Sequence, residues 1–580
     1  MMAASVTRHG PSMMLIEGSL TALTLAVAFL RPTLGAGAFA RAERRLGALA
    51  RRRTLSVIAV GLAAFFLRLA ILPLSPVPKP FVQDDFSFLL AGDTFASGRL
   101  TNPTPRMWEH FESFQLTMKP TYMSMYFPAQ GMVLAAGKVL TGRPWLGVLV
   151  ANALMCAAIC WALQAWLPPA WALLGGAVAI LRLGLFSYWI DTYSGGGAIA
   201  ALGGALALGA LPRFLRAPRL RHSMTMAIGA ALLAISRPYE GILLCLPVAA
   251  ALVWRIHQGK PHLGRRAILR CAALPLATVL AVVAWMGYYD YRAFGNPLTP
   301  PYATDRAEYA VVPYFVWQPQ RPEPRYRHKE MRDFYLGVEL HTFEKIHSLS
   351  GFLPQNLLKA LRGILFFSGI ALLPPLLLLR RVFLDRRIRF LVVCVIVLAV
   401  GMLPQVFLIP HYIAPFTVAF YAIGLQAMRH LRLWRPEGSP AGLFLTRGIV
   451  ALCCLLAAVR LFAAPLGLLL PVWPGVWASE WYGSAPAGLA RARIQSELEK
   501  LPGPQLVLVA YSAHHNSMDE WVYNDADIDH SKVIWARAMD RADDLDLVHY
   551  YASRRAWLLQ PDLHPAKLAP YPGNGVAQHP

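Results

Sequence analysis

Long apolar runs alternate along this chain with short basic clusters and two long polar stretches. A membrane-spanning helix needs about 20 predominantly apolar residues. The run Met13–Leu30 contains Glu17, and whether it is a further span stays open. The other runs predict spans near Leu55–Leu74, Trp145–Leu167, Ala170–Phe186, Gly195–Leu211, Met224–Ile235, Gly241–Trp254, Ile268–Tyr288, Leu358–Leu379, Phe390–Leu408, Tyr412–Met428 and Gly448–Leu470. The pattern predicts an all-α polytopic membrane protein with about 10–12 transmembrane helices.

The basic clusters test this topology, because Lys and Arg concentrate in cytoplasmic loops. If Arg41–Arg53 lies in the cytoplasm, counting the crossings brings every other basic cluster to the same side. The long polar stretches and the C-terminal segment then fall on the opposite, extracytoplasmic side. The remaining clusters are Arg213–Arg221, Arg255–Arg270, Arg380–Arg389 and Arg429–Arg435.

Composition agrees with a protein that faces lipid. Of the 580 residues, 56% are hydrophobic and only 15% are charged, whereas a soluble protein carries about 25% charged residues. The net charge of +23 sits in the clusters between spans, and no nucleic-acid-binding motif is present, so no nucleic-acid partner is expected. The seven cysteines lie in or beside apolar runs and do not indicate a disulfide framework.

We divide the chain into three parts. Residues 1–53 form a hydrophobic segment and a basic cytoplasmic linker, and residues 54–470 form the membrane domain with external loops at 76–144 and 290–356. Residues 471–580 form a small α/β extracytoplasmic domain, with a strand at Gln505–Tyr511, a helix near Ser531–Asp540 and a second apolar segment at Ala556–Leu559.

The first external loop carries the acidic pair Asp84 and Asp85, about ten residues beyond an apolar span. At the edge of a low-dielectric region the pKa of a carboxylate is raised. Such a group suits a general base or a metal ligand, although a solvated loop start would look the same. Further along the loop, Lys119 could pair with phosphate, and Tyr126 lies in a segment, Met118–Met132, that suggests an interfacial helix.

Three further external turns hold candidates, each with an ordinary structural alternative. Asp191 precedes the glycines 195–197, which suit either phosphate contact or helix packing. Arg237 interrupts an apolar region and could bind an anionic head group or pair with Glu240. His411 begins an apolar run, where it could contact phosphate, act as an acid or base, or simply pack. Weaker signals for a substrate groove come from Tyr288, Tyr289, Tyr302 and Arg306 in the second loop.

This arrangement resembles the GT-C glycosyltransferases, in particular the bacterial family 39 group related to protein O-mannosyltransferases and to the lipid A aminoarabinose transferase. The resemblance covers most of Leu55–Leu470 and depends on Asp84-Asp85, on Gly98, on the segment from Pro128 to Trp145, and on Asp191. The family commonly has Asp-Glu where this chain has Asp84-Asp85, and the C-terminal domain is not part of the shared core.

The resemblance implies an inverting transfer of a sugar from a polyprenyl-phosphate donor to an extracytoplasmic lipid, glycan or protein acceptor. It implies that Asp84 is the general base and that Asp85 or Asp191 orients the acceptor or holds a divalent cation. Arg237 and His411 are our choices for the donor phosphate, with Lys119 and Tyr126 as further substrate-binding residues. The Ala-, Arg- and Leu-rich composition and the absence of an ER retention signal favour a bacterial inner membrane as the location. A transporter or flippase and an O-antigen-ligase-like protein remain as alternatives.

Overall fold

The computed structural model describes residues 12–194, 196–258, 265–463, 465–468 and 488–572. Several predictions reach beyond these ranges. Residues 1–11 of the N-terminal segment, Gly195 at the start of one span, residues 259–264 of one basic cluster, and the join between the last span and the C-terminal domain lie outside the described residues.

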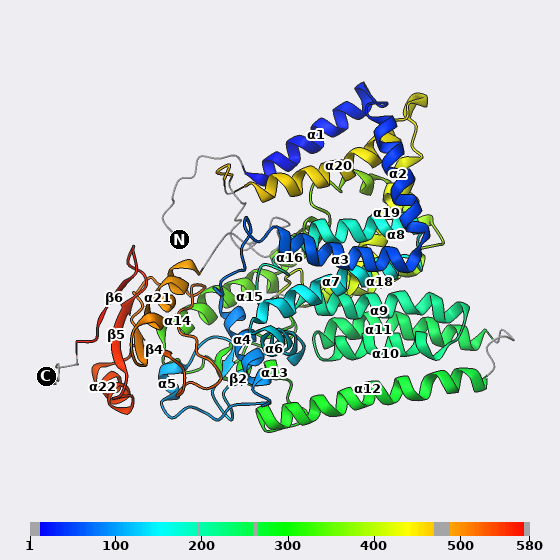
Figure 1. Cartoon of the computed structure of the whole chain (residues 1–580). Helices are drawn as coiled ribbons and strands as arrows, with labels where there is room; N and C mark the ends of the chain where they lie inside the picture. The colour runs from blue at the N-terminus through cyan, green and yellow to red at the C-terminus, as the bar shows by residue number, and fades with distance from the viewer. Residues whose placement is uncertain (1–11, 195, 259–264, 464, 469–487, 573–580) are drawn as a thin grey trace.

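Most of the chain is a bundle of long helices (Figure 1). Seven described helices are long and apolar enough to cross a membrane, and the chain is a multi-pass membrane protein, as the sequence predicted. These helices are α1 (Met13–Leu30), α3 (Arg53–Ala70), α7 (Pro144–Leu163), α9 (Gly197–Arg216), α11 (Pro238–His257), α12 (Arg265–Phe294) and α20 (Ala441–Leu461). Shorter apolar helices accompany them: α8 (Pro169–Ala179), which continues into the π-helix η1 (Ile180–Gly184), α10 (Leu220–Ala234), α18 (Arg389–Met402) and α19 (Thr417–Arg432).

The predicted span Leu358–Leu379 is not one continuous helix. Helix α16 (Leu349–Ser368) ends because Gly369 has φ 58° and ψ −170°, which no α-helix can continue. A 3₁₀ turn η3 (Pro374–Leu378) and α17 (Leu379–Leu384) follow. The Glu17 carboxylate of α1 accepts hydrogen bonds from the N–H groups of Ile370 and Ala371 at 3.0 and 3.1 Å. The acid that interrupts the first apolar run therefore accepts hydrogen bonds from two backbone N–H groups directly after the helix break.

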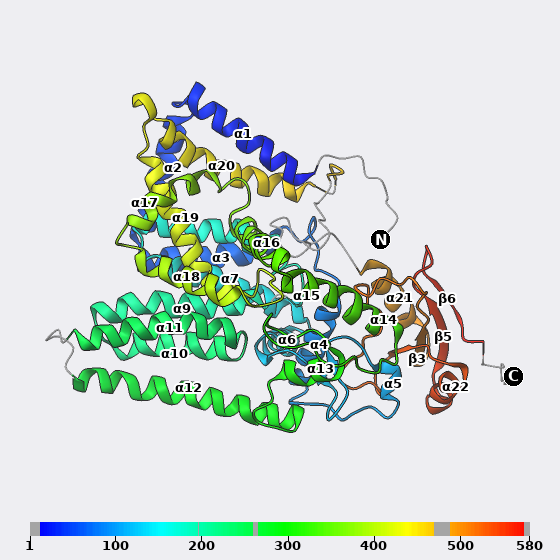
Figure 2. The same ribbon diagram turned by 180° about the vertical axis from the view of Figure 1, so that it is seen from behind.

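Helices α9, α10 and α11 run side by side in both the front and the rear view (Figures 1 and 2). Gly203 of α9 and Gly229 of α10 face each other at their closest approach. A Cβ on Gly229 would lie 2.6 Å from the Gly203 carbonyl oxygen. Since hydrophobic segregation contributes little between helices in lipid, such close backbone contact is a main source of their packing energy.

The polar segments gather at one end of the bundle, while α2 (Ala36–Arg51) lies at the other (Figure 1). The segment Met118–Met132, predicted as a helix, is helical only from Pro128. Strand β1 (Leu116–Thr117) lies just before the segment and pairs antiparallel with β2 (Met123–Ser124) within it. This end also contains α4 (Gln83–Ala96), α5 (Trp108–Phe111), α6 (Pro128–Thr141), α13 (Pro301–Tyr309), α14 (Lys329–Arg332), η2 (Asp333–Glu339) and α15 (Leu340–His347), while η4 (Ala414–Phe416) and η5 (Pro436–Gly438) flank α19.

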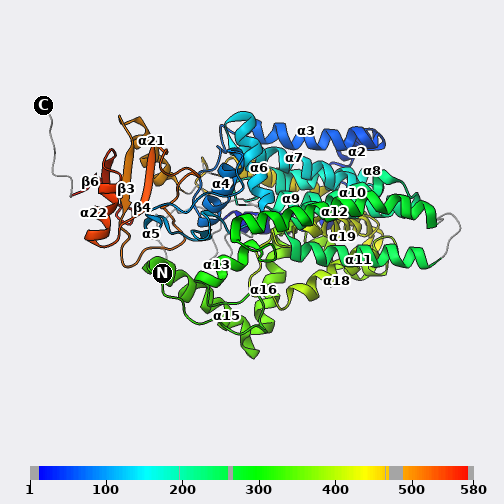
Figure 3. The same cartoon turned by 90° about the horizontal axis from the view of Figure 1, so that it is seen from below.

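Residues 488–572 form a C-terminal sheet domain beyond the polar end of the bundle (Figure 3). Its strands β3 (Gln505–Val509), β4 (Val533–Arg537), β5 (Arg555–Gln560) and β6 (Lys567–Pro570) lie in the order β4-β3-β5-β6. Helices α21 (Leu489–Lys500) and α22 (Arg541–Tyr550) complete it. The α/β class and the first strand were predicted, but the predicted helix near Ser531–Asp540 is wrong: β4 occupies this segment. Its five residues are all buried beside β3, and a strand buried on both faces shows no alternation that would distinguish it.

Candidate active site

Asp84 lies in the first turn of α4, where the chain leaves a proline-rich connection. An acidic side chain is favourable at this position because the N-terminal end of a helix carries partial positive charge. The Asp84 carboxylate is half-buried and accepts a hydrogen bond of 2.6 Å from the Tyr126 hydroxyl. Burial raises the pKa of Asp84, while Tyr126 and the positive charge of Arg237 act in the opposite direction. A carboxylate with a raised pKa and one polar partner suits proton abstraction.

Asp85 has a different environment. Its side chain is buried and accepts N–H bonds from Tyr193 at 2.9 Å and Ser194 at 2.8 Å, with a third from Phe81 at 3.3 Å. Burial raises the pKa of Asp85 to about 6, while these amide donors act to lower it. The geometry therefore makes Asp85 a clamp between α4 and the turn before α9, with its oxygens already occupied.

Aromatic rings form the wall around Asp84. Tyr126 stacks on Phe88 with ring centroids 4.2 Å apart, and Tyr302 of α13 meets the Tyr126 ring edge-on at 5.6 Å. Tyr314 continues the row, 6.0 Å from Tyr302. Sequence analysis gave Tyr302 only as one of four weak candidates, because the fold alone brings the second loop against the first.

Arg237 supplies the positive charge of the site. It lies at the break between α10 and α11, is 9% exposed, and its guanidinium carbon is 4.2 Å from the centroid of the Tyr412 ring. Glu240 is close enough to interact electrostatically, yet no ion pair within 4 Å joins the two among the residues that the structure describes. The two charges therefore interact without direct contact, and both sequence interpretations, pairing with Glu240 and binding of an anionic head group, stay predictions.

His411 stands beside this cation. The Tyr188 hydroxyl accepts from the His411 backbone N–H at 2.9 Å and lies 2.9 Å from the ring Nδ1. Burial and the charge of Arg237 hold the pKa of His411 well below its usual value, which favours the neutral ring. We assign the hydroxyl as donor to Nδ1, which leaves the ring proton on Nε2 as a hydrogen-bond donor.

The close packing of α9 and η4 fixes the position of this histidine. A Cβ on Gly204 would lie 1.9 Å from the carbonyl oxygen of Pro415. Only glycine therefore allows the turn that carries His411 and Tyr412 to approach α9 this closely.

Asp191 and Lys119 lie apart from this cluster. Asp191 accepts a bond of 2.9 Å from Arg68, which is fully buried in α3 and also donates to the Ser75 carbonyl oxygen. Lys119 is exposed and lies 4.2 Å above the Trp108 ring. Asp191 thus serves a buried ion pair, and no hydrogen bond or ion pair within the described ranges links Lys119 to Asp84. Among the described residues, no group of three His, Cys, Asp or Glu side chains could hold a metal ion.

Two residues near the site escaped the sequence analysis. Arg68 carried a usable signal, because a charged residue inside an apolar run is a functional or structural candidate by default. Gln115 carried none. It has a φ of 60°, uncommon for a residue other than glycine, and its side chain helps to lower the pKa of Asp84.

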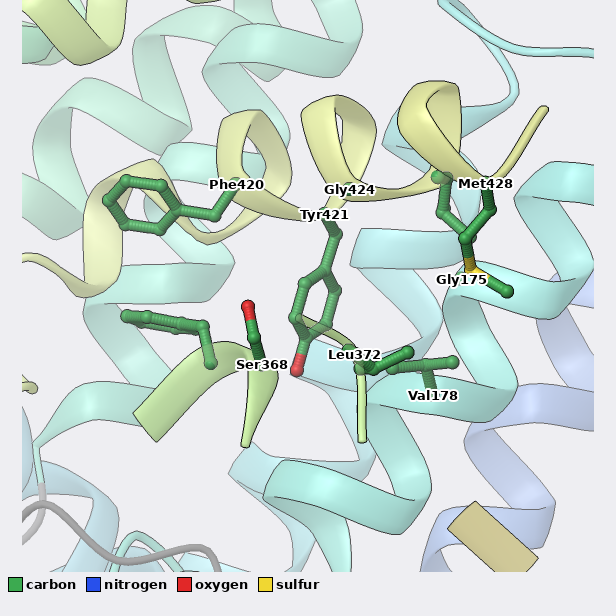
Figure 4. Close-up of a pocket in the computed structure, with 10 residues that line it drawn as sticks. Gly175, Val178, Ser368, Leu372, Phe420, Tyr421, Gly424 and Met428 are labelled. Atoms are coloured by element: carbon green, nitrogen blue, oxygen red, sulfur yellow. The ribbon is translucent and has the colours of Figure 1, made fainter. Parts of the chain in front are cut away.

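A separate pocket lies between α8, the end of α16 and α19 (Figure 4). Its walls are mainly apolar, and the Tyr421 side chain extends across it toward Ser368 and Leu372. None of the predicted site residues lines it. A pocket with this lining suits a hydrocarbon chain better than a sugar or a phosphate.

No protein-family model and no curated protein matches the sequence. Among solved structures, the oligosaccharyltransferase of Archaeoglobus fulgidus in complex with Zn and sulfate has a TM-score of 0.48 and 10% identity, covering 87% of this chain and 67% of that chain. ArnT from Cupriavidus metallidurans bound to undecaprenyl phosphate has a TM-score of 0.45 and 13% identity, covering 87% and 92%. The archaeal oligosaccharyltransferase AglB from A. fulgidus, in complex with an inhibitory peptide and a dolichol-phosphate, has a TM-score of 0.44 and 10% identity, covering 88% and 69%. The similarity to these three structures is one of overall fold, at 10–13% identity and TM-scores of 0.44–0.48.

Proposed function

We propose that the protein is an integral membrane glycosyltransferase that moves a sugar from a polyprenyl-phosphate donor to an acceptor hydroxyl or amine. One observation carries the proposal. A half-buried carboxylate, Asp84, and a nearly buried cation, Arg237, share one aromatic-lined site at the polar end of the membrane helices. Such a site provides both a proton acceptor and a phosphate-binding group.

In the proposed reaction, Asp84 accepts the proton of the acceptor group as that group attacks the anomeric carbon. The new bond to the anomeric carbon forms while its bond to the phosphate oxygen breaks, so the configuration inverts. Polyprenyl phosphate leaves with the bonding electrons, and Arg237 with the Nε2–H of His411 stabilises its charge. Tyr126 holds Asp84 in position, while Asp85 and Asp191 support the surrounding backbone.

We further propose that the membrane is a bacterial inner membrane and that the site and the C-terminal sheet domain face the extracytoplasmic side. The support is the distribution of Arg and Lys, since the basic clusters of the sequence fall on the other side in the predicted topology. A divalent cation would have to bind with fewer than three acidic or histidine side chains from the described residues, so dependence on added metal is tested in the same assay.

The test is sugar transfer by the purified protein from polyprenyl-phosphate sugars, with the wild type, Asp84→Asn and Asp85→Asn compared. We expect transfer by the wild type and its loss in folded Asp84→Asn, by about 10²–10⁴-fold for a general base. Asp85→Asn should keep more activity, because its role is to accept backbone N–H bonds. Equal transfer by wild type and Asp84→Asn would assign the base elsewhere. Absence of transfer by the folded wild type from a panel of donors would favour a transporter.

A further inference from the structure

We propose that the C-terminal sheet domain is a positioning part of the active site, which fixes the first turn of α4 and thereby the orientation of Asp84. The inference rests on the proposed function for its catalytic meaning. The structural part of the inference, that the domain holds α4 in place, is independent of that function because it concerns only contacts between the domain and one short helix.

The first contact is an aromatic stack. Phe86 of α4 is 2% exposed, and its ring stacks on Tyr523 of the C-terminal domain at 4.7 Å with an interplanar angle of 21°. The guanidinium carbon of Arg491, in α21, lies 4.8 Å from the Phe86 ring centroid. Arg491 also donates to the carbonyl oxygens of Trp521 and Tyr523, so Arg491 and Tyr523 are held together within the domain. Arg491 and Tyr523, which are hydrogen-bonded to each other, thus form the surface of the domain that packs against Phe86 of α4.

Two more contacts flank this stack. The Gln83 side-chain amide donates to the Met518 sulfur at 3.5 Å. At Gly488, immediately before α21, a Cβ would lie 2.4 Å from the carbonyl oxygen of Pro80. The domain therefore touches the connection that leads into α4 as well as the helix itself.

These contacts lie on a different side of α4 from the acids. Gln83 and Phe86 are three residues apart and share a helix face. Asp84 and Asp85, between them, point to Tyr126 and to the turn before α9. The first turn of α4 is therefore held between the C-terminal domain and the membrane domain, and any shift of the helix moves Asp84 against its partners.

A buried network keeps the domain itself in place. Arg537 of β4 is 1% exposed, donates to Glu520 at 2.6 Å and donates to the Glu112 carbonyl oxygen in the first loop at 2.7 Å. Glu330 of the second loop lies 3.7 Å from the same guanidinium. One arginine therefore connects the domain with both external loops. These buried contacts hold the domain in a fixed position.

The experiment uses the full-length protein with Tyr523→Ala, the conservative Tyr523→Phe, and Tyr550→Ala as a matched control. Tyr550 is an exposed tyrosine of the same domain, whose ring centroid lies 5.9 Å from the guanidinium carbon of Arg106. The measurements are kcat and KM for a polyprenyl-phosphate sugar, and hydrogen exchange of the α4 amides. We expect Tyr523→Ala to lower kcat by about ten- to a hundredfold, because small misplacements of a catalytic group have effects of this size. KM should not change, and exchange in the first turn of α4 should accelerate.

Tyr523→Phe and Tyr550→Ala should match the wild type in both measurements. Unchanged kcat and unchanged α4 exchange in Tyr523→Ala would overturn the inference. If Tyr523→Ala unfolds the domain, as faster exchange in β3 and β4 would reveal, retained α4 protection would also overturn it and lost protection would support it. If the wild type transfers no sugar from any donor, the proposed function fails, and the exchange comparison alone decides whether the domain positions α4.

Discussion

Replacing Tyr126 with Phe removes one hydroxyl group and one hydrogen bond, the 2.6 Å bond to Asp84. The ring remains and can still stack on Phe88. We expect Tyr126→Phe to shift the acid side of the activity–pH profile to higher pH. Asp84 works as a base only when ionised, which holds above its pKa. Since burial raises the pKa of Asp84 and Tyr126 lowers it, loss of the hydroxyl leaves burial less opposed and raises the pKa further.

The size of the shift follows from the strength of the bond. A hydrogen bond to a charged acceptor contributes about 1.5–3 kcal/mol, and about 1.4 kcal/mol corresponds to a tenfold change in an ionisation equilibrium. The acid limb should therefore move up by about one to two pH units. At a pH on that limb, the ionised fraction of Asp84 and hence kcat/KM should fall about ten- to a hundredfold.

The assay is kcat/KM for the lipid-linked donor measured across the pH range in which the protein stays folded. Tyr309→Phe is the matched control, because the Tyr309 hydroxyl donates to the Glu112 carboxylate at 2.7 Å, away from Asp84. It removes the same kind of bond and should leave the acid limb where it is. An unmoved acid limb in folded Tyr126→Phe would refute the reasoning, and so would an equal shift in Tyr309→Phe.

Two other substitutions test the ion-pair and phosphate assignments. Arg68→Met removes the hydrogen-bonded partner of the buried Asp191 carboxylate and leaves, among the described residues, only the electrostatic interaction with Arg460, so it should lower the free energy of unfolding by up to about 3–5 kcal/mol. The double variant Arg68→Met/Asp191→Asn should recover part of the loss in a denaturation series in detergent, and a single variant as stable as the wild type would contradict this. Arg237→Gln should weaken binding of polyprenyl phosphate at least about tenfold, as expected for loss of a charge-assisted contact. Arg216→Gln, at the C-terminal end of α9 in a basic cluster, should bind like the wild type by calorimetry, and equal weakening in both would make the effect a general one of surface charge.

The sequence predicted the membrane helices well because an apolar run long enough to cross a bilayer has few other uses. Prediction of secondary structure from the sequence failed where the local hydrophobic pattern and the tertiary contacts favour different structures. A helix ends at Gly369 inside an apolar run, and the hydrophobic pattern of the run does not predict the positive φ of that glycine. Val533–Arg537 is too short for its periodicity to distinguish a buried strand from a helix, and its neighbour β3 decides the outcome.

The candidate site shows the same division. The acidic pair was predicted from its position beyond a span, but the different environments of Asp84 and Asp85 depend on amides more than a hundred residues away. Lys119 was selected for its charge and for its place in the same loop. Lys119 lies between the paired strands β1 and β2, and its side chain ends against the Trp108 ring.

The buried charges around the site differ in how they are satisfied, and this difference carries the functional argument. Asp85 has three amide donors, and Asp191 has Arg68. Asp84 accepts one hydrogen bond from Tyr126, and Arg237 lies over the Tyr412 ring and interacts electrostatically with Glu240 and Asp84, with no ion pair within 4 Å among the described residues. Since a carboxylate and a guanidinium can each form several hydrogen bonds, both groups can also bind a ligand. A molecule that offers Asp84 a proton and Arg237 a phosphate would satisfy both at once, and an acceptor beside a lipid-linked phosphosugar has this chemistry.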